Sequence, residues 1–167
     1  MSETIAGPIR TCRAGRVLAL DVGGKRIGVA VSDESRAIAS PLRYVTRGQR
    51  DRADLRLLAT EWNAELLVVG LPTGMSGREG PQAAEVRAYA EPLAVALGLP
   101  LDYWDERLTT AIAERMLIES GVRRAARRER IDAVAASIIL QDYLDAARIR
   151  RRRSEQHHGP GTGSGTT

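Results

Sequence analysis

The order of the apolar runs along the chain constrains its fold more than any other feature of the sequence. Three strand-like runs come first, over residues 17–22, 26–33 and 37–46, and only short connections join them. Because short connections join antiparallel neighbours, these runs predict three antiparallel strands in succession. Each later strand-like run is preceded by a segment with helical spacing of its apolar residues.

The second half of the chain alternates helices with strands. The predicted helices cover about 51–62, 82–97, 109–120 and 128–147, and the two later strands cover 66–69 and 100–104. A strand reached through a helix lies parallel to its neighbour in the sheet. The sequence therefore predicts an α/β domain with one mixed sheet, in which three antiparallel strands are extended by two parallel strands and flanked by helices.

The length of 167 residues and the 43% hydrophobic content suit one compact domain. We expect a flexible N-terminal arm over residues 1–15, the domain over 16–150, and a disordered, basic and Gly-rich tail over 151–167. No apolar stretch is long enough to span a bilayer or to form a secretory signal, so we expect a cytoplasmic protein with no membrane partner. Cys12 is the only cysteine, which excludes an internal disulfide and leaves an intermolecular one open.

Acidic residues stand at three positions that this fold can bring together. Asp21 ends the first apolar strand, Asp105 and Glu106 follow the last strand, and Asp132 lies in the final helix. Three carboxylates gathered without a cation would force some of them to stay protonated, so the pattern favours a divalent metal site. Each acid also has a structural alternative, because Asp21 can bond the amides of the following turn and the others can complement helix N-termini.

The basic residues are almost all arginines and give the chain a formal charge of +4. Such a balance permits nucleic-acid binding, and a GC-rich coding genome explains it equally well. Arginine runs at 123–130 and 148–153 are typical of a helix face that is exposed to solvent. Four basic residues near the acids are candidates to neutralise substrate phosphates, with exposure or local ion pairing as the alternative: Lys25, Arg26, Arg78 and Arg107.

Several motifs occur together in this chain. They are Leu20-Asp21-Val22-Gly23 with residues 25–33, Val68-Val69-Gly70-Leu71-Pro72, Asp105-Glu106-Arg107-Leu108-Thr109-Thr110, and Ile131-Asp132-Ala133 with Ile139-Leu140-Gln141. With them, the chain resembles the YqgF family, also called RuvX, of bacterial ribonuclease H-like nucleases. The resemblance implies a ribonuclease H-like fold and a metal-binding triad of Asp21, Glu106 and Asp132. The chain departs from the family at Gly24, where threonine is usual, and in the loop 73–77.

The resemblance also implies an activity. It implies hydrolysis of phosphodiester bonds with two Mg²⁺ or Mn²⁺ ions held by the triad. Maturation of the 5′ end of precursor 16S rRNA is the first expectation. Resolution of Holliday junctions in DNA, which requires a two-fold dimer, is the second. The expected partner is therefore precursor rRNA or branched DNA, and a homodimer is left open.

Two other classes of function stay in view. A non-catalytic nucleic-acid-binding module would use the same basic surface without cutting its ligand. An actin-like nucleotide phosphatase or kinase also begins with an Asp-x-Gly turn that meets phosphate. That class normally needs two such domains, and this chain is too short for two.

Overall fold

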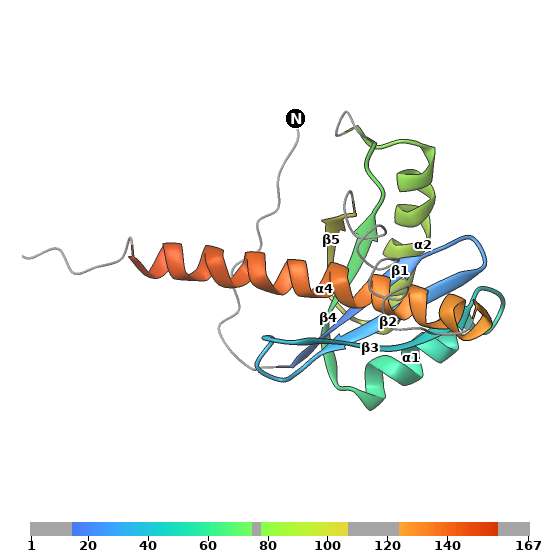
Figure 1. The fold of residues 1–167 in the computed structure, drawn as a ribbon, viewed down its shortest axis with the longest axis horizontal. Helices are drawn as coiled ribbons and strands as arrows, with labels where there is room; N and C mark the ends of the chain where they lie inside the picture. Colours follow the sequence, from blue (N-terminus) through green and yellow to red (C-terminus); the bar gives the residue numbers. More distant parts are fainter. Residues whose placement is uncertain (1–14, 75–77, 107–123, 157–167) are drawn as a thin grey trace, which may run out of the picture.

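The computed structural model describes residues 15–74, 78–106 and 124–156. The described elements, in chain order, are β1 (Arg16–Val22), β2 (Arg26–Ser32), β3 (Ala39–Thr46), α1 (Asp51–Glu61), β4 (Ala64–Leu71), α2 (Pro81–Leu97), β5 (Leu101–Asp105) and α4 (Arg124–Gln156). Three helices flank the strands in this part of the chain (Figure 1). The predicted helix over 109–120 lies outside the described residues.

The five strands form one sheet in the order β3-β2-β1-β4-β5. β2 pairs antiparallel with β1 and with β3, whereas β4 pairs parallel with β1 and with β5. The prediction of three antiparallel strands extended by two parallel ones is confirmed. β1 lies at the centre of the sheet, so its residues are held by hydrogen-bonded strands on both sides.

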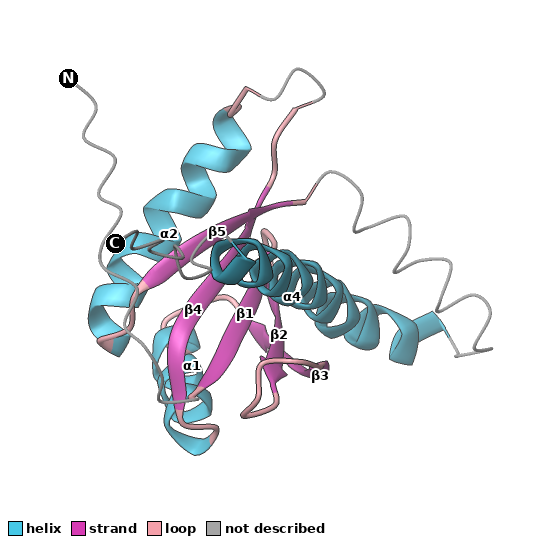
Figure 2. Ribbon diagram, turned by 90° about the vertical axis from the view of Figure 1, so that its left-hand side faces the viewer, coloured by secondary structure: helices cyan, strands magenta, loops and turns pink. Residues whose placement is uncertain are grey.

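The two faces of the sheet are covered by different helices, with α4 on one face and α1 and α2 on the other (Figure 2). Successive side chains of a strand point to opposite faces. Leu18 and Leu20 therefore join the core under α1 and α2, while Val17 and Ala19 join the core under α4. The same alternation assigns Asp21 to the α4 face.

The final helix is longer than the sequence pattern predicts. It runs to Gln156, so its predicted end near residue 147 is wrong, and residues 151–156 are helical although they were expected in the disordered tail. Arginine is a good helix former, and neither glycine nor proline interrupts the chain before Gly159. An ion pair between Arg151 and Glu155, one helical turn apart, adds to the last turns. No helix among the described residues is apolar over a stretch that could cross a bilayer.

Candidate active site

Asp21 is positioned by the most rigid part of the sheet. The four residues before it, 17–20, are fully buried, and Asp21 itself stands opposite Gly28 of β2 in the antiparallel register. The Gly23 amide donates to the carbonyl oxygen of Arg26 at 2.9 Å. The Gly23 amide is one of the turn amides that Asp21 could have bonded in a purely structural role, and it is already used by Arg26.

Glu106 reaches Asp21 across a neighbouring strand. β5 ends beside β4, and the Glu106 amide donates to the Leu71 carbonyl oxygen at 3.2 Å. A Cβ on Gly70 would overlap the Glu106 carboxyl group and the side chain of Ile139. The missing side chain at Gly70 thus leaves the space in which Glu106 forms a hydrogen bond with Asp21.

Asp132 comes to the same end of the sheet because α4 crosses β2 without a side chain between them. A Cβ on Gly28 would overlap the backbone oxygen of Asp132. Buried small residues of α4, Ala133 and Ala136, keep the helix close to the strands. Since Gly28 is the register partner of Asp21, this close crossing brings the charge of Asp132 near Asp21.

The three acids are not equivalent in their contacts. Asp21 and Glu106 bond to each other, whereas Asp132 Oδ2 lies 2.8 Å from Arg26 Nε in an ion pair. Among the described residues, no group of three Asp, Glu, His or Cys side chains is close enough together to hold a metal ion as it stands. The structure therefore brings two members of the predicted triad into contact and holds the third beside them on Arg26.

Burial and mutual repulsion shift the protonation of these carboxyls. Burial raises the pKa of Glu106 to about 8, and the charge of Asp21 adds to the rise. Burial also raises the pKa of Asp21, where the hydrogen bond from Glu106 acts in the opposite direction. Burial also raises the pKa of Asp132, and this effect outweighs the lowering by the positive charge of Arg26. The shifts at Asp21 and Glu106 favour one proton on this pair near neutral pH, with Glu106 as the donor of their hydrogen bond.

The residues of this site fit a divalent cation. Asp132 Oδ2 is buried, and the Arg26 guanidinium 2.8 Å away is the cationic group beside it. The proton shared by Asp21 and Glu106 is in the place where a cation would remove their repulsion. Carboxylate oxygens are the ligands that Mg²⁺ and Mn²⁺ prefer.

The predicted basic residues have different surroundings. Arg26 pairs with Asp132 and lies over the Tyr44 ring, with 5.6 Å from its guanidinium carbon to the ring centroid. Lys25 is exposed in the turn between β1 and β2, and Arg78 is exposed in the loop before α2. Arg107 lies outside the described residues.

Asp105 is the acid that the sequence left as an alternative to Glu106. Its Oδ1 accepts a hydrogen bond from the Thr73 hydroxyl, which ties the end of β5 to the loop after β4. Asp105 also raises the pKa of Glu106 by its charge. Its described hydrogen bond is therefore a contact with the loop, while Glu106 is the carboxyl that contacts Asp21.

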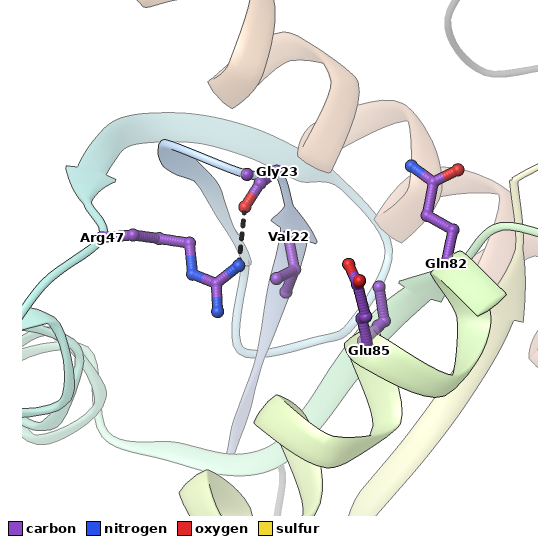
Figure 3. Close-up of a pocket in the computed structure, with 7 residues that line it drawn as sticks. Val22, Gly23, Arg47, Gln82 and Glu85 are labelled. Carbon is purple, nitrogen blue, oxygen red and sulfur yellow. Dashed lines mark hydrogen bonds between the residues drawn. The ribbon is translucent and has the colours of Figure 1, made fainter.

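Arg47 is a residue near this site that sequence reasoning missed. Its Nη1 donates to the Gly23 carbonyl oxygen at 3.2 Å (Figure 3). Arg47 also places its guanidinium over the Tyr89 ring. It borders a pocket of about 230 Å³ between the β1–β2 turn and α2, together with Gln82 and Glu85. The pocket lies on the face of the sheet opposite the three acids. Arg47 directly follows the end of β3, one residue after the register pair Arg26–Thr46 and beside Lys25. This position in the sequence is the signal that could have pointed to it.

The electrostatics of the acids lead to a stability prediction. With a chelator present, Glu106→Gln is expected to raise the free energy of unfolding at pH 8.5 by about 2 kcal/mol and to change it little at pH 5. A carboxyl with a raised folded pKa binds more protons in the folded than in the unfolded protein. The unfolding free energy therefore falls as pH rises from the ordinary carboxyl range to about 8, and glutamine removes that loss.

Thermal unfolding followed by circular dichroism at the two pH values measures this difference. Glu91→Gln, at an exposed position of α2, is the matched control and is expected to change neither value. An equal shift of Glu106→Gln at both pH values would contradict the shared proton.

Comparison with known proteins places this chain among relatives of one family. Residues 15–146 match the model of a family described as RuvX, Holliday junction resolvase. A protein of Roseiflexus sp. (strain RS-1) is 49% identical over 136 residues, which cover 80% of this chain and 96% of that protein. A protein of Cereibacter sphaeroides (strain ATCC 17025) is 49% identical over 135 residues, covering 80% of this chain and 84% of the relative. Both relatives are named "Putative pre-16S rRNA nuclease".

Solved structures share the fold at low sequence identity. Thermus thermophilus RuvC, in complex with a Holliday junction substrate, superposes with a TM-score of 0.50 at 16% identity, over 80% of this chain and 96% of that one. The fowlpox virus resolvase, also in complex with junction DNA, gives a TM-score of 0.50 at 9% identity, over 79% of this chain and 98% of that one. These likenesses, with the observed sheet, confirm the ribonuclease H-like fold.

Proposed function

Since this chain belongs to the RuvX family, we propose that it is a nuclease that hydrolyses phosphodiester bonds with Asp21, Glu106 and Asp132 as ligands of two divalent ions. The observation that carries the proposal is the contact of Glu106 with Asp21 in the space left by Gly70, with Asp132 brought beside them where α4 crosses Gly28. The three acids come from β1, the end of β5 and α4, and their negative charges repel one another. This repulsion destabilises the folded protein, so stability alone does not explain why they are held together.

The chain's own residues supply position and charge to this reaction. Bound Mg²⁺ or Mn²⁺ would activate a water molecule for attack on phosphorus and would neutralise charge on the departing 3′ oxygen. Asp21 offers a carboxylate on the central strand, which cannot shift without disturbing strands on both sides. Glu106 would hold a cation as a carboxylate, and the positive charge of the cation would lower the raised pKa of this group.

Arg26 has two roles in this proposal. It neutralises Asp132 while that carboxyl has no cation, which is the 2.8 Å ion pair of the structure. If Asp132 held a metal ion instead, the guanidinium would be free to bind a phosphate oxygen of the substrate. Lys25, on the exposed turn beside it, adds a second positive charge at the same edge of the sheet.

For the substrate we propose precursor 16S rRNA, because that is the RNA in the names of relatives that are nearly half identical to this chain. The second candidate is a four-way DNA junction, which the family description favours. A junction resolvase must make two symmetric cuts, and this requires a two-fold dimer of the chain.

Cleavage of two labelled substrates separates the candidates. The full-length protein is incubated with a precursor 16S rRNA end and with a mobile four-way DNA junction, each with Mg²⁺, with Mn²⁺ and with a chelator. We expect metal-dependent cutting of the RNA. Symmetric cutting of the junction by a dimer would instead favour the second candidate, and no metal-dependent cutting of either would leave the non-catalytic binding module as the better account.

A further inference from the structure

The C-terminal end of α4 carries a dense positive charge that the catalytic site does not use. Residues 149–156, which we call the arginine arm, are all exposed and contain four arginines and one glutamate. The family match ends at residue 146, so the arm lies beyond the residues that the family model covers. Figure 1 shows this end of α4 extending past the sheet.

The arm begins where the contacts between α4 and the sheet end. Leu144 is the last core residue of the helix. Gln141 bonds the backbone of the β2–β3 connection on both sides, through Ala37 O at 3.0 Å and the Ala39 amide at 2.9 Å. Arg148 donates to the same Ala37 carbonyl oxygen at 3.2 Å. The helix is therefore anchored up to Arg148, and its direction beyond that point is fixed by the anchored part.

The arginines of the arm surround the helix rather than forming one face. Arg150, Arg151, Arg152 and Arg153 are consecutive, and four consecutive residues cover a full helical turn. Apart from Ile149 at its start, the arm is polar on every side and has no apolar stripe to bury against a protein core. Like charges three residues apart, as at Arg150 and Arg153, also repel each other. An anionic partner that reaches several sides of the helix would relieve this repulsion.

We propose that the arginine arm binds the phosphodiester backbone of the substrate strand at a distance from the acids that cut it. This inference rests on the proposed function, because it names a second contact for the same nucleic acid. At about 1.5 Å per residue, Arg150 and Arg152 lie roughly 27 to 30 Å along α4 from Asp132. With about 3.4 Å between phosphates of a stacked strand, that distance corresponds to roughly eight or nine nucleotides.

Binding of RNA in the presence of a chelator tests the arm without cleavage. The variant R150Q/R152Q removes two arm charges, and R50Q/R52Q removes two exposed charges at the start of α1 as a matched control. The probes are a 30-nucleotide and a 6-nucleotide single-stranded RNA. We expect R150Q/R152Q to reduce the slope of log Kd against log salt for the long RNA by about 1.4, at about 0.7 for each lost contact.

The two RNA lengths test whether the arm and the catalytic end hold the same strand. The advantage of the long RNA over the short one, as a ratio of Kd values, is expected to fall about tenfold or more in R150Q/R152Q, because a bridging strand gains affinity from two linked contacts. R50Q/R52Q is expected to keep both the slope and the ratio. R150K/R152K, which keeps the charge, is expected to retain most of both.

Several outcomes would overturn this inference. Equal effects of R150Q/R152Q and R50Q/R52Q would mean that only net charge matters, and an unchanged ratio would mean that the arm does not bridge. Competition by polyglutamate as effective as competition by unlabelled RNA would point to an acidic protein as the partner. Cleavage is measured separately, so an arm that binds RNA in a protein that cuts nothing would contradict the proposed function and leave the arm's role intact.

Discussion

Asp21→Asn is expected to lower the rate of metal-dependent cleavage at least about a thousandfold. Several kcal/mol of charge stabilisation in the transition state depend on ions held at this carboxylate, and each 1.4 kcal/mol is about tenfold in rate. The amide has nearly the same shape and cannot carry the negative charge that a divalent cation needs. Because the variant removes a buried, repelled carboxyl, it is expected to fold at least as well as the parent.

Single-turnover cleavage with saturating protein measures the chemical step for Asp21→Asn, and RNA binding in chelator shows whether the substrate still binds. Asp142→Asn, at an exposed position of α4, is the matched control and is expected to retain the parent rate. Asp21→Asn with full cleavage would remove Asp21 from the reaction. Unchanged cellular function in this variant would favour the non-catalytic binding module.

Gly28→Ala is expected to destabilise the protein by about 3 kcal/mol, at the upper end of ordinary overpacking. The added Cβ would overlap the backbone oxygen of Asp132, and a backbone atom cannot turn aside as a flexible side chain can. Either α4 must move away from the sheet or β2 must bend. Both changes shift Asp132 relative to Asp21, so cleavage is also expected to fall in the molecules that remain folded.

Denaturant unfolding of Gly28→Ala and Gly24→Ala measures this effect against a matched control. Gly24 has nothing within 4 Å of an added Cβ, so its change to alanine is expected to stay within about 0.5 kcal/mol of the parent. If the two variants had equal stability, the close crossing of α4 over Gly28 would not hold the site together.

Local patterns were sufficient to predict the sheet. Short connections between the first three strands and helices before the last two leave few topologies open, and the observed order β3-β2-β1-β4-β5 is the expected mixed sheet. The end of α4 could not be read in the same way. The apolar stripe stops near Leu144, but helix propensity and ion pairing continue the helix to Gln156 without any core contact.

The three acids of the candidate site could be named from the sequence, whereas their contacts could not. Asp21 ends the first apolar strand and Glu106 follows the last one, whereas Asp132 lies within α4, which begins at Arg124. Residue spacing did not predict the ion pair of Arg26 with Asp132 or the hydrogen bond of Arg47 to Gly23. These pairings join residues from different elements, and only the packed arrangement brings them within reach.

By itself, the sequence determined that three antiparallel strands are extended by two parallel ones and which acids are candidates for the site, because these depend on the spacing of apolar residues and on the motifs. The tertiary structure decided how close those acids come. Gly28 and Gly70 lie on the strands at either side of β1, and their missing side chains admit the backbone of α4 and the carboxyl of Glu106. A glycine in a strand shows only that space is left, and what fills the space is fixed when distant segments pack together.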